Sequence, residues 1–123
     1  MVYTPQSIRP FIGAREFNTS RSFYRDLGFE EKVLSPGFSV FHLGAMSFYL
    51  QDAYVKDWVD NTQVFLEVDD LDAFWHRLDA LDLPSRYEGV RVEPIRNLAW
   101  GRECFIHDPS GILWHVGEFT SNE

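Results

Sequence analysis

The chain has 123 residues and a formal net charge of -8, from 19 acidic and 11 basic side chains. Its length suits one domain with a modest core, and its content of 45% hydrophobic and 16% aromatic residues excludes a disordered chain. The negative charge would repel phosphate backbones and anionic lipids, so we expect neither nucleic acid nor a membrane surface as a partner. The same charge would attract a cationic ligand, although acidity also serves solubility alone.

The cysteine content and the N-terminus indicate the compartment. Cys104 is the sole cysteine, which excludes an internal disulfide and any site with several thiolates. The first ten residues contain no basic start followed by an apolar run, and no apolar stretch reaches the roughly 18 residues that span a bilayer. We therefore expect a cytoplasmic protein.

The first part of the chain predicts a strand, a helix and three further strands. Alternating apolar residues from Ser7 to Arg15 indicate a strand, and Pro10, which lacks a donor, makes it an edge strand or one exchanged with another copy. Asn18 to Ser20 can cap a short amphipathic helix that ends at Gly28. Three short strands follow, at Phe29–Leu34, Phe38–Leu43 and Met46–Gln51.

The second part repeats this order after a linker that ends near Asn61. Gln63 to Val68 indicates a strand and Asp70 to Leu81 a helix, which Pro84 prevents from continuing. Three more strands are predicted, at Tyr87–Val92, Arg102–His107 and Ile112–Val116. The last two are joined by an Asp-Pro-Ser-Gly turn at 108–111.

The repeat predicts the fold class. The helical segments 22–27 and 73–78 share the pattern of a small residue, two aromatic residues and a leucine. A lone module of this size would have a marginal core, so two modules would pack together. The prediction is a single α+β domain, residues 1–123, whose βαβββ modules at 7–52 and 62–118 form curved mixed sheets around a cleft suited to a small molecule.

Several motifs resemble the vicinal oxygen chelate superfamily across nearly the whole chain. They are the first strand, the segment Ser20-x-x-Phe23-Tyr24-x-x-Leu27-Gly28-Phe29, and the turn Asp108-Pro109-Ser110-Gly111 before the last strand. This superfamily includes glyoxalase I, extradiol dioxygenases, fosfomycin-resistance enzymes and bleomycin-resistance proteins. The resemblance implies the glyoxalase/bleomycin resistance fold, in which paired modules form a U-shaped cleft, and fold transfers more safely than chemistry.

Metal-dependent members of this superfamily place His, Gln or Glu on the first and last strand of each module. Here His115 is a strong candidate and Gln63 a weak one. Arg9 would repel a cation, and Phe48 to Leu50 offer no ligand ahead of Gln51. Since one imidazole holds a metal poorly, we expect no cofactor. The alternative is a divalent metal ion held by His115, Gln63 and Gln51 in a glyoxalase-like lyase, isomerase or dioxygenase.

Within the superfamily, the chain is most similar to the bleomycin-resistance proteins. The similarity lies in Asp60-Asn61-Thr62, in Trp100-Gly101-Arg102-Glu103, and in Asp108-Pro109 followed by His115. Those relatives are acidic homodimers that sequester a cationic glycopeptide drug, without chemistry, in two clefts at the dimer interface. The resemblance implies a homodimeric, noncatalytic binding protein whose partner is a cationic aromatic small molecule such as a bleomycin-type drug.

The resemblance also implies which residues bind the ligand: Phe38, Gln51, Asp60, Asn61, Phe65, Trp100, Glu103 and His115. The aromatic members would sandwich a flat ligand, the amides would exchange hydrogen bonds with it, and the carboxylates would neutralise a bound amine. Core packing is the alternative for the aromatic residues and His115, and surface solvation is the alternative for the others. The remaining possibility is an interaction module with a filled cleft, in which Tyr54 and Trp58 form the contact surface.

Overall fold

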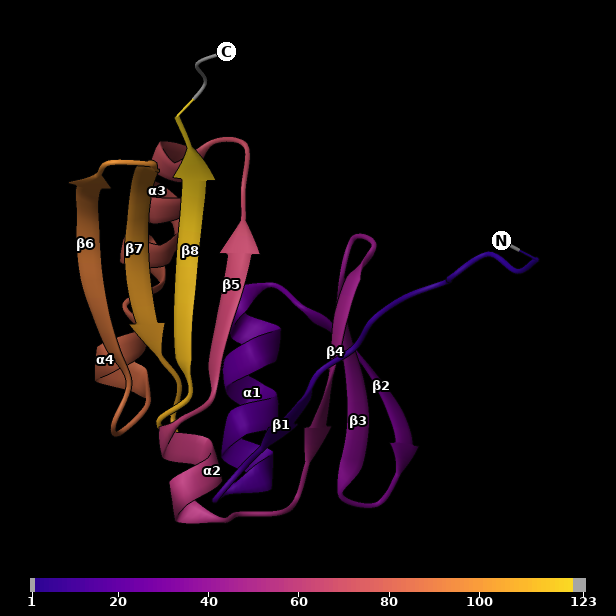
Figure 1. The fold of residues 1–123 in the computed structure, drawn as a ribbon. Coiled ribbons are helices and arrows are strands. Elements are labelled where there is room, and N and C mark those ends of the chain that lie inside the picture. The colour runs from indigo at the N-terminus through magenta and orange to yellow at the C-terminus, as the bar shows by residue number, and fades with distance from the viewer. Residues whose placement is uncertain (1, 121–123) are drawn as a thin grey trace.

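The computed structural model describes residues 2–120, in which two βαβββ modules follow one another (Figure 1). The first contains β1 (Phe11–Gly13), α1 (Phe17–Leu27), β2 (Glu30–Ser35), β3 (Phe38–Leu43) and β4 (Met46–Gln51). The second contains β5 (Gln63–Glu67), α3 (Leu71–Leu81), β6 (Arg91–Leu98), β7 (Gly101–His107) and β8 (Leu113–Phe119). Two short helices, α2 (Lys56–Asp60) and α4 (Leu83–Arg86), lie between these elements. The predicted α+β class with paired modules is confirmed.

Each module forms its own four-stranded mixed sheet, with strand orders β1-β4-β3-β2 and β5-β8-β7-β6. The first and last strands of each module pair in parallel, and the other pairs are antiparallel. Phe11 pairs with Tyr49 in the first sheet just as Phe65 pairs with His115 in the second. Because the strand register is the same in both modules, a residue in one sheet has a counterpart at the same place in the other sheet.

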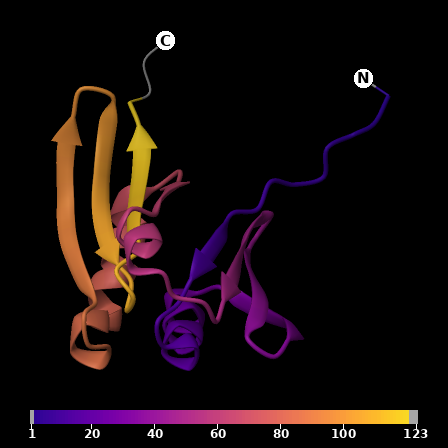
Figure 2. The ribbon, with the colours of Figure 1, turned by 60° about the horizontal axis from the view of Figure 1, so that its bottom comes forward.

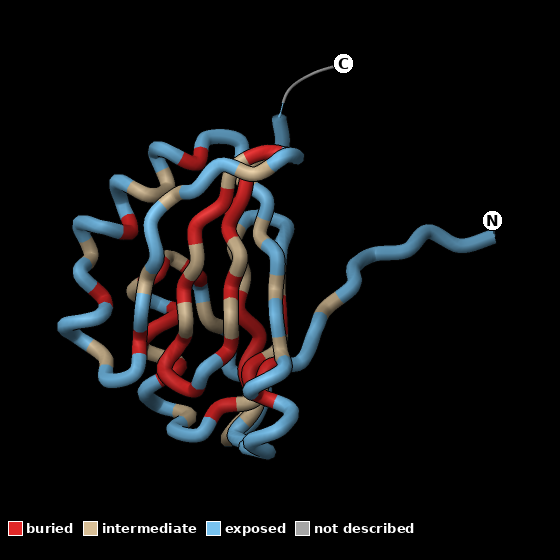
Figure 3. The backbone as a smooth tube through the Cα atoms, turned by 60° about the vertical axis from the view of Figure 1, so that its left-hand side comes forward, coloured by how far each residue is buried: buried red, intermediate tan, exposed pale blue. Residues whose placement is uncertain are grey.

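The helices cover one face of each sheet. Helix α1 contacts β2 and β4, whereas α3 contacts β7 and β8. Along β4 the buried Phe48 and Leu50 alternate with the half-buried Tyr49 and Gln51, as expected when successive side chains point to opposite faces. Figure 3 shows buried positions gathered on the central strands, with exposed positions along the N-terminal arm. No helix among residues 2–120 is long and apolar enough to cross a membrane.

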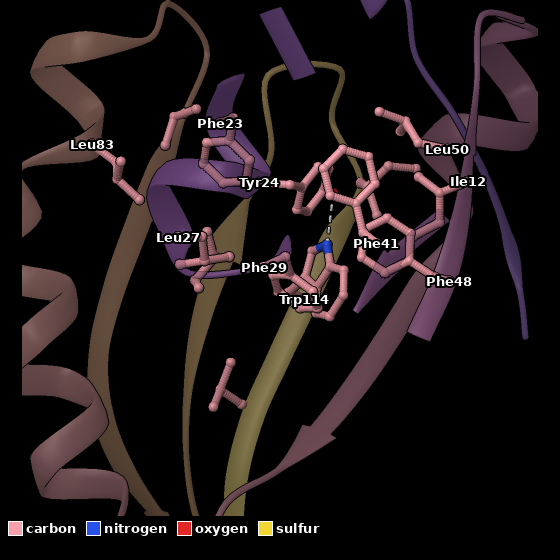
Figure 4. Packing of buried hydrophobic residues seen from close by; sticks show 14 of the residues in the cluster. Ile12, Phe23, Tyr24, Leu27, Phe29, Phe41, Phe48, Leu50, Leu83 and Trp114 are labelled. Atoms are coloured by element: carbon pink, nitrogen blue, oxygen red, sulfur yellow. Dashed lines mark hydrogen bonds between the residues drawn. The ribbon is translucent and has the colours of Figure 1, made fainter. Parts of the chain in front are cut away.

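A hydrogen-bonded chain of buried side chains ties the two modules together, and Figure 4 shows its link between Trp114 and Tyr24. The Trp114 indole N–H on β8 donates to Tyr24 Oη on α1 over 2.9 Å, and the Tyr24 hydroxyl donates to Asp108 Oδ2 over 2.6 Å. Asp108 Oδ1 also accepts three backbone N–H groups of the predicted turn, those of Ser110, Gly111 and Ile112. Burial raises the pKa of Tyr24 and of Asp108, and the hydrogen bonds to Asp108 oppose its rise.

Three predictions for the first part of the chain are wrong in their bounds. The strand expected at Ser7–Arg15 is limited to Phe11–Gly13, which pair with β4, although the Pro10 carbonyl still accepts from the Tyr49 N–H over 2.9 Å. Residues 2–8 form an exposed, extended arm (Figures 1 and 2). Helix α1 begins at Phe17 after Glu16, without a side-chain cap, so the predicted caps lie inside it. The expected linker contains the helix Lys56–Asp60.

Two predictions for the second part also require correction. The strand expected at Tyr87–Val92 is found at Arg91–Leu98, because Gly89 turns the chain with a φ of 84° and Tyr87 ends a helix. Pro94 is tolerated within this strand because it falls at a register shift in the pairing with β7. Helix α3 ends at Leu81 because Asp82 adopts a left-handed conformation with a φ of 51°. The expectation that Pro84 prevents further helix is wrong, since Pro84 lies in the first turn of α4, where a missing N–H does not matter.

Candidate ligand-binding site

An aromatic cluster lies on the face of the second sheet that points away from α3. The ring centroids of Trp100 and Phe119 are 5.1 Å apart, and that of Phe65 lies 5.8 Å from Trp100 and 5.9 Å from Phe119. Phe65 is 44% exposed, Trp100 37% and Phe119 52%. Trp100 occupies the tight connection between β6 and β7. Adjacent accessible rings of this kind offer a stacking surface for a flat ligand.

A polar chain crosses the same face beside these rings. His115 Nδ1 lies 3.0 Å from Glu103 Oε1, and His115 Nε2 lies 2.7 Å from Gln63 Oε1. Arg96 Nη2 donates to Glu103 Oε2 over 3.2 Å. Because Glu103 is only 5% exposed, its carboxylate depends on these partners for the charge and hydrogen bonds that water would otherwise supply.

The donor and acceptor roles of the His115 ring nitrogens depend on its tautomer and on the orientation of the Gln63 amide. With an ionised Glu103, Nδ1 carries a proton, since a carboxylate only accepts. If the Gln63 oxygen faces Nε2, that nitrogen also carries a proton and the ring is an imidazolium. If the amide is turned so that its N–H faces Nε2, the ring is neutral. Gln63 can therefore either accept from His115 Nε2 or donate to it, so the two side chains can offer donors or acceptors to a ligand.

Gly117 makes room for Phe65. It pairs with Glu103 across the sheet, and a Cβ atom at this position would come within 2.9 Å of Phe65 Cζ. The missing side chain thus lets the Phe65 ring lie flat on the sheet, close to Trp100. Sequence reasoning did not include Gly117 or Phe119, although a glycine inside a strand often marks such a close approach.

A pocket of about 430 Å³ opens on this face and is lined by Gln63, Val64, Phe65, Trp100, Glu103 and His115. The structure therefore brings together four of the residues expected to bind ligand, namely Phe65, Trp100, Glu103 and His115. Gln63, expected only as a weak metal ligand, joins them. A larger groove of about 980 Å³ lies between the modules, and Phe65 is the sole one of the expected ligand-binding residues that lines it.

The expected residues of the first module lie on the corresponding face of the first sheet. Phe38 pairs with Gln51 across β3 and β4. The Phe38 ring stacks on Tyr49 with centroids 5.1 Å apart, and Tyr49 lies 4.8 Å from Phe11. Phe11, at 57% exposure, and Tyr49 were not expected in the site. They are the register counterparts of Phe65 and His115, so only the strand pairing could have identified them.

Asp60 and Asn61 belong to neither aromatic face. Asp60 Oδ2 accepts a hydrogen bond from Lys56 Nζ over 2.7 Å at the exposed end of α2. Asn61 Nδ2 donates to the backbone oxygen of Asp57 over 2.6 Å. Both side chains thus make local contacts that stabilise the helix end, and neither lines the pocket beside Trp100.

The donor set does not fit a divalent metal. Among residues 2–120, no three His, Cys, Asp or Glu side chains are grouped as metal ligands. The first-strand and last-strand positions of the second module bring Gln63 and His115 together, but the equivalent positions of the first module hold Arg9 and Tyr49. A guanidinium repels a cation, and one imidazole with an amide oxygen binds it weakly.

Comparisons with solved structures identify the fold. The bleomycin-binding protein from bleomycin-producing Streptomyces verticillus, solved with copper(II)-bleomycin, is 25% identical, and the match covers all of both chains with a TM-score of 0.78. The chain has the glyoxalase/bleomycin resistance fold. Another structure with this fold is TnmS3, an antibiotic-binding protein from Streptomyces sp. CB03234, with 21% identity, a TM-score of 0.74, and coverage of 98% of this chain and 99% of that one.

The same fold also occurs in an enzyme. Lactoylglutathione lyase from Agrobacterium tumefaciens matches with 22% identity and a TM-score of 0.68, over 94% of this chain and 95% of the lyase. No family model and no curated protein matches the sequence. Because both a binding protein and a lyase share the glyoxalase/bleomycin resistance fold, the fold alone does not decide between the two classes.

Proposed function

We propose that the chain is a noncatalytic protein that binds and sequesters a cationic aromatic small molecule, such as a bleomycin-type drug. The observation that carries this proposal is the exposed cluster of Phe65, Trp100 and Phe119 beside the buried carboxylate of Glu103. The rings would stack on a heteroaromatic group of the ligand, while Glu103 would accept a hydrogen bond from its amine. Arg96, whose side chain is half exposed, would give up part of its contact with Glu103 to the ligand.

In this proposal the binding unit is a homodimer, in which the first sheet of one copy faces the second sheet of the other. Phe11 on the first sheet and Phe65 on the second are both largely exposed in the single chain, and a facing copy would cover them. By strand alternation Lys32 lies on the Tyr49 face of the first sheet, and Glu67 lies on the Phe65 face of the second. Arg9 and Lys32 on one face would thus meet Glu67 and Glu103 on the other, which supports pairing of unlike faces.

Titration with copper-loaded bleomycin tests the proposal. We expect quenching of tryptophan fluorescence at micromolar ligand and a loss of affinity of about tenfold or more in Trp100→Ala. Trp58→Ala is the matched control, because Trp58 is exposed on α2 and lines neither face. Absence of quenching at micromolar ligand, together with no protection of bleomycin-sensitive cells, would contradict the drug-binding proposal. Sedimentation velocity on the same sample tests the homodimer.

A metal-dependent lyase, isomerase or dioxygenase is the second candidate. It is favoured by one observation, the contact of His115 with Gln63 and Glu103 on an accessible sheet face. Elemental analysis of protein purified without chelator separates the candidates, because a catalytic metal site requires stoichiometric zinc, nickel, iron or manganese. Such a content, lost in His115→Ala but retained in His76→Ala, would replace the binding proposal with the enzymatic one.

A further inference from the structure

The exposed face of the first sheet carries a cation, Arg9, whose part in the proposed function is limited to the pairing of the two copies and does not include contact with the ligand. The Arg9 guanidinium carbon lies 5.6 Å from the centroid of the Tyr49 ring, and Arg9 Nη1 donates to Tyr49 Oη over 3.2 Å. Within residues 2–120 Arg9 forms no ion pair, and its Nε–H is buried without an acceptor. The hydrogen-bonding capacity of this guanidinium is thus only partly used.

Four of the nine arginines, Arg9, Arg15, Arg77 and Arg91, have no carboxylate partner among residues 2–120, and of these Arg77 donates to the Leu27 carbonyl and Arg91 contacts His107. Other arginines on the surface bind acidic side chains, namely Arg21, Arg25, Arg86, Arg96 and Arg102. Arg15 resembles Arg9 in having no carboxylate partner among the described residues, and its guanidinium lies 5.9 Å from the Tyr54 centroid. Arg15 differs from Arg9 because it lies outside the sheet face, which makes it a matched control.

The surroundings of Arg9 are aromatic, with Phe11 tilted by 37° against Tyr49. Phe11 and Phe38 stack at an interplanar angle of 15° with centroids 6.0 Å apart, and Phe38 stacks on Tyr49 at 23°. Because Tyr49 Oη accepts from Arg9, its own hydroxyl proton is free to donate to another group. Guanidinium N–H groups and a phenol O–H therefore lie beside a surface that can stack on a planar ligand.

We propose that Arg9, Phe11, Phe38 and Tyr49 bind an aromatic carboxylate, with the rings stacking on its aromatic part. A carboxylate accepts two N–H groups of one guanidinium with matched geometry, and Tyr49 adds a third donor. The second sheet has the opposite character at the equivalent positions, where Gln63 replaces Arg9, His115 replaces Tyr49 and Glu103 replaces Phe38. In the homodimer of the proposed function, Arg9 of one copy and Glu103 of the other would line the same cleft, which would then favour a zwitterionic ligand. Only this last step rests on the proposed function.

The test uses 2-naphthoate as the probe, followed by the arginine Nε–H signals in heteronuclear NMR. We expect the Arg9 signal to shift saturably, and 2-naphthylmethanol, which is uncharged, to bind about tenfold more weakly. Arg9→Gln, which introduces the residue type of Gln63, should weaken naphthoate binding about tenfold, whereas Arg15→Gln should leave it unchanged. Tyr49→Phe should weaken it by a smaller factor, since it removes one donor.

Each contrary outcome overturns the inference. Equal naphthoate affinity in Arg9→Gln and in the unmodified chain would exclude a role for Arg9. Equal weakening in Arg15→Gln would indicate a general charge effect, and equal binding of the alcohol would exclude carboxylate recognition. Titration of the same samples with copper-bleomycin keeps the two proposals separate. Naphthoate binding without bleomycin binding would retain the Arg9 site and remove the proposed function, and the reverse result would do the opposite.

Discussion

Tyr24 on α1 and Asp108 in the turn before β8 are joined by a hydrogen bond of 2.6 Å in the interior of the protein. The two residues are 84 positions apart and belong to different modules. Trp114 donates to the same hydroxyl, so the phenol both gives and receives a hydrogen bond. This contact fixes the helix of the first module against the last strand of the second, which is the strand that carries His115.

Replacement of Tyr24 by phenylalanine should destabilise the protein substantially. Tyr24→Phe removes one donor from the buried Asp108 and leaves the Trp114 indole N–H without an acceptor, at a cost of about 2–4 kcal/mol in the free energy of unfolding. Urea denaturation followed by circular dichroism measures the change. The control is Tyr87→Phe, which removes a bond to the half-exposed Asp26 and should cost about 1 kcal/mol or less. Equal costs in the two variants would contradict the structural role of Tyr24.

Stability should fall in strongly alkaline solution because of the same tyrosines. Burial and the bond to Asp26 raise the pKa of Tyr87 to about 12, and burial raises that of Tyr24 well above its ordinary value of 10.0. Above about pH 10 the unfolded phenols release protons that the folded ones keep, so the folded state binds more protons and its stability falls towards pH 12. The free energy of unfolding in urea, measured at several pH values in this window, should fall less steeply in Tyr87→Phe. An unchanged slope would contradict this origin.

The sequence correctly predicted turns and helices whose conformation is determined by residues close together in the chain. The Asp-Pro-Ser-Gly turn and the helical spacing of Phe23, Tyr24 and Leu27 are such signals, and both lie where expected. The strand after α4 was expected from Tyr87, because Tyr87 begins an apolar alternation, but it starts at Arg91. The Tyr87 hydroxyl instead donates to Asp26 on α1, and a contact between residues so far apart in sequence cannot be predicted from spacing. Pro94 lies inside that strand because a register shift in the partner pairing accommodates it.

Which residues line the site could be predicted only where they are close in sequence, because the rest are brought together by pairing between distant strands. Trp100 and Glu103 were expected together because they are close in sequence, and they line one pocket. Asp60 and Asn61 are close to Gln63 in sequence, but the unexpected helix α2 directs their side chains into local hydrogen bonds. Residues contributed by pairing between distant strands, such as the glycine beneath Phe65, could be found only from the structure.

Gly117→Ala should weaken ligand binding while leaving the fold intact. A methyl group at this position would lie within 2.9 Å of Phe65 Cζ, so the ring must move away from Trp100 and the stacking surface would be disrupted. We expect a loss of affinity for copper-bleomycin of about tenfold, measured by isothermal titration calorimetry. The double variant Gly117→Ala/Phe65→Leu removes the contact with the ring, while the 3.1 Å approach to the Arg102 carbonyl remains, so it should recover part of the stability but not the affinity. Undiminished binding in Gly117→Ala would show that the Phe65 position does not matter.

Glu103→Gln should reduce the affinity for a cationic ligand more than any other single charge removal on the second sheet. The amide keeps the size of the side chain, but it loses the negative charge that lies 3.0 Å from His115 Nδ1 and 3.2 Å from Arg96 Nη2. A bound amine would then meet Arg96 and His115 without a buried counter-charge, and we expect binding to weaken by about tenfold or more.

Calorimetry of Glu103→Gln should be paired with Glu93→Gln on the same face. Glu93 is an exposed carboxylate that contacts His107, so its removal changes the net charge equally without touching the pocket beside Trp100. At low salt both variants should bind the cationic ligand slightly more weakly, because each removes one negative charge that attracts it from a distance. At high salt only Glu103→Gln should still bind more weakly, because salt screens exposed charges more than buried ones. Equal losses that vanish together at high salt would assign the effect of Glu103 to the overall charge of the protein and not to contact with the ligand.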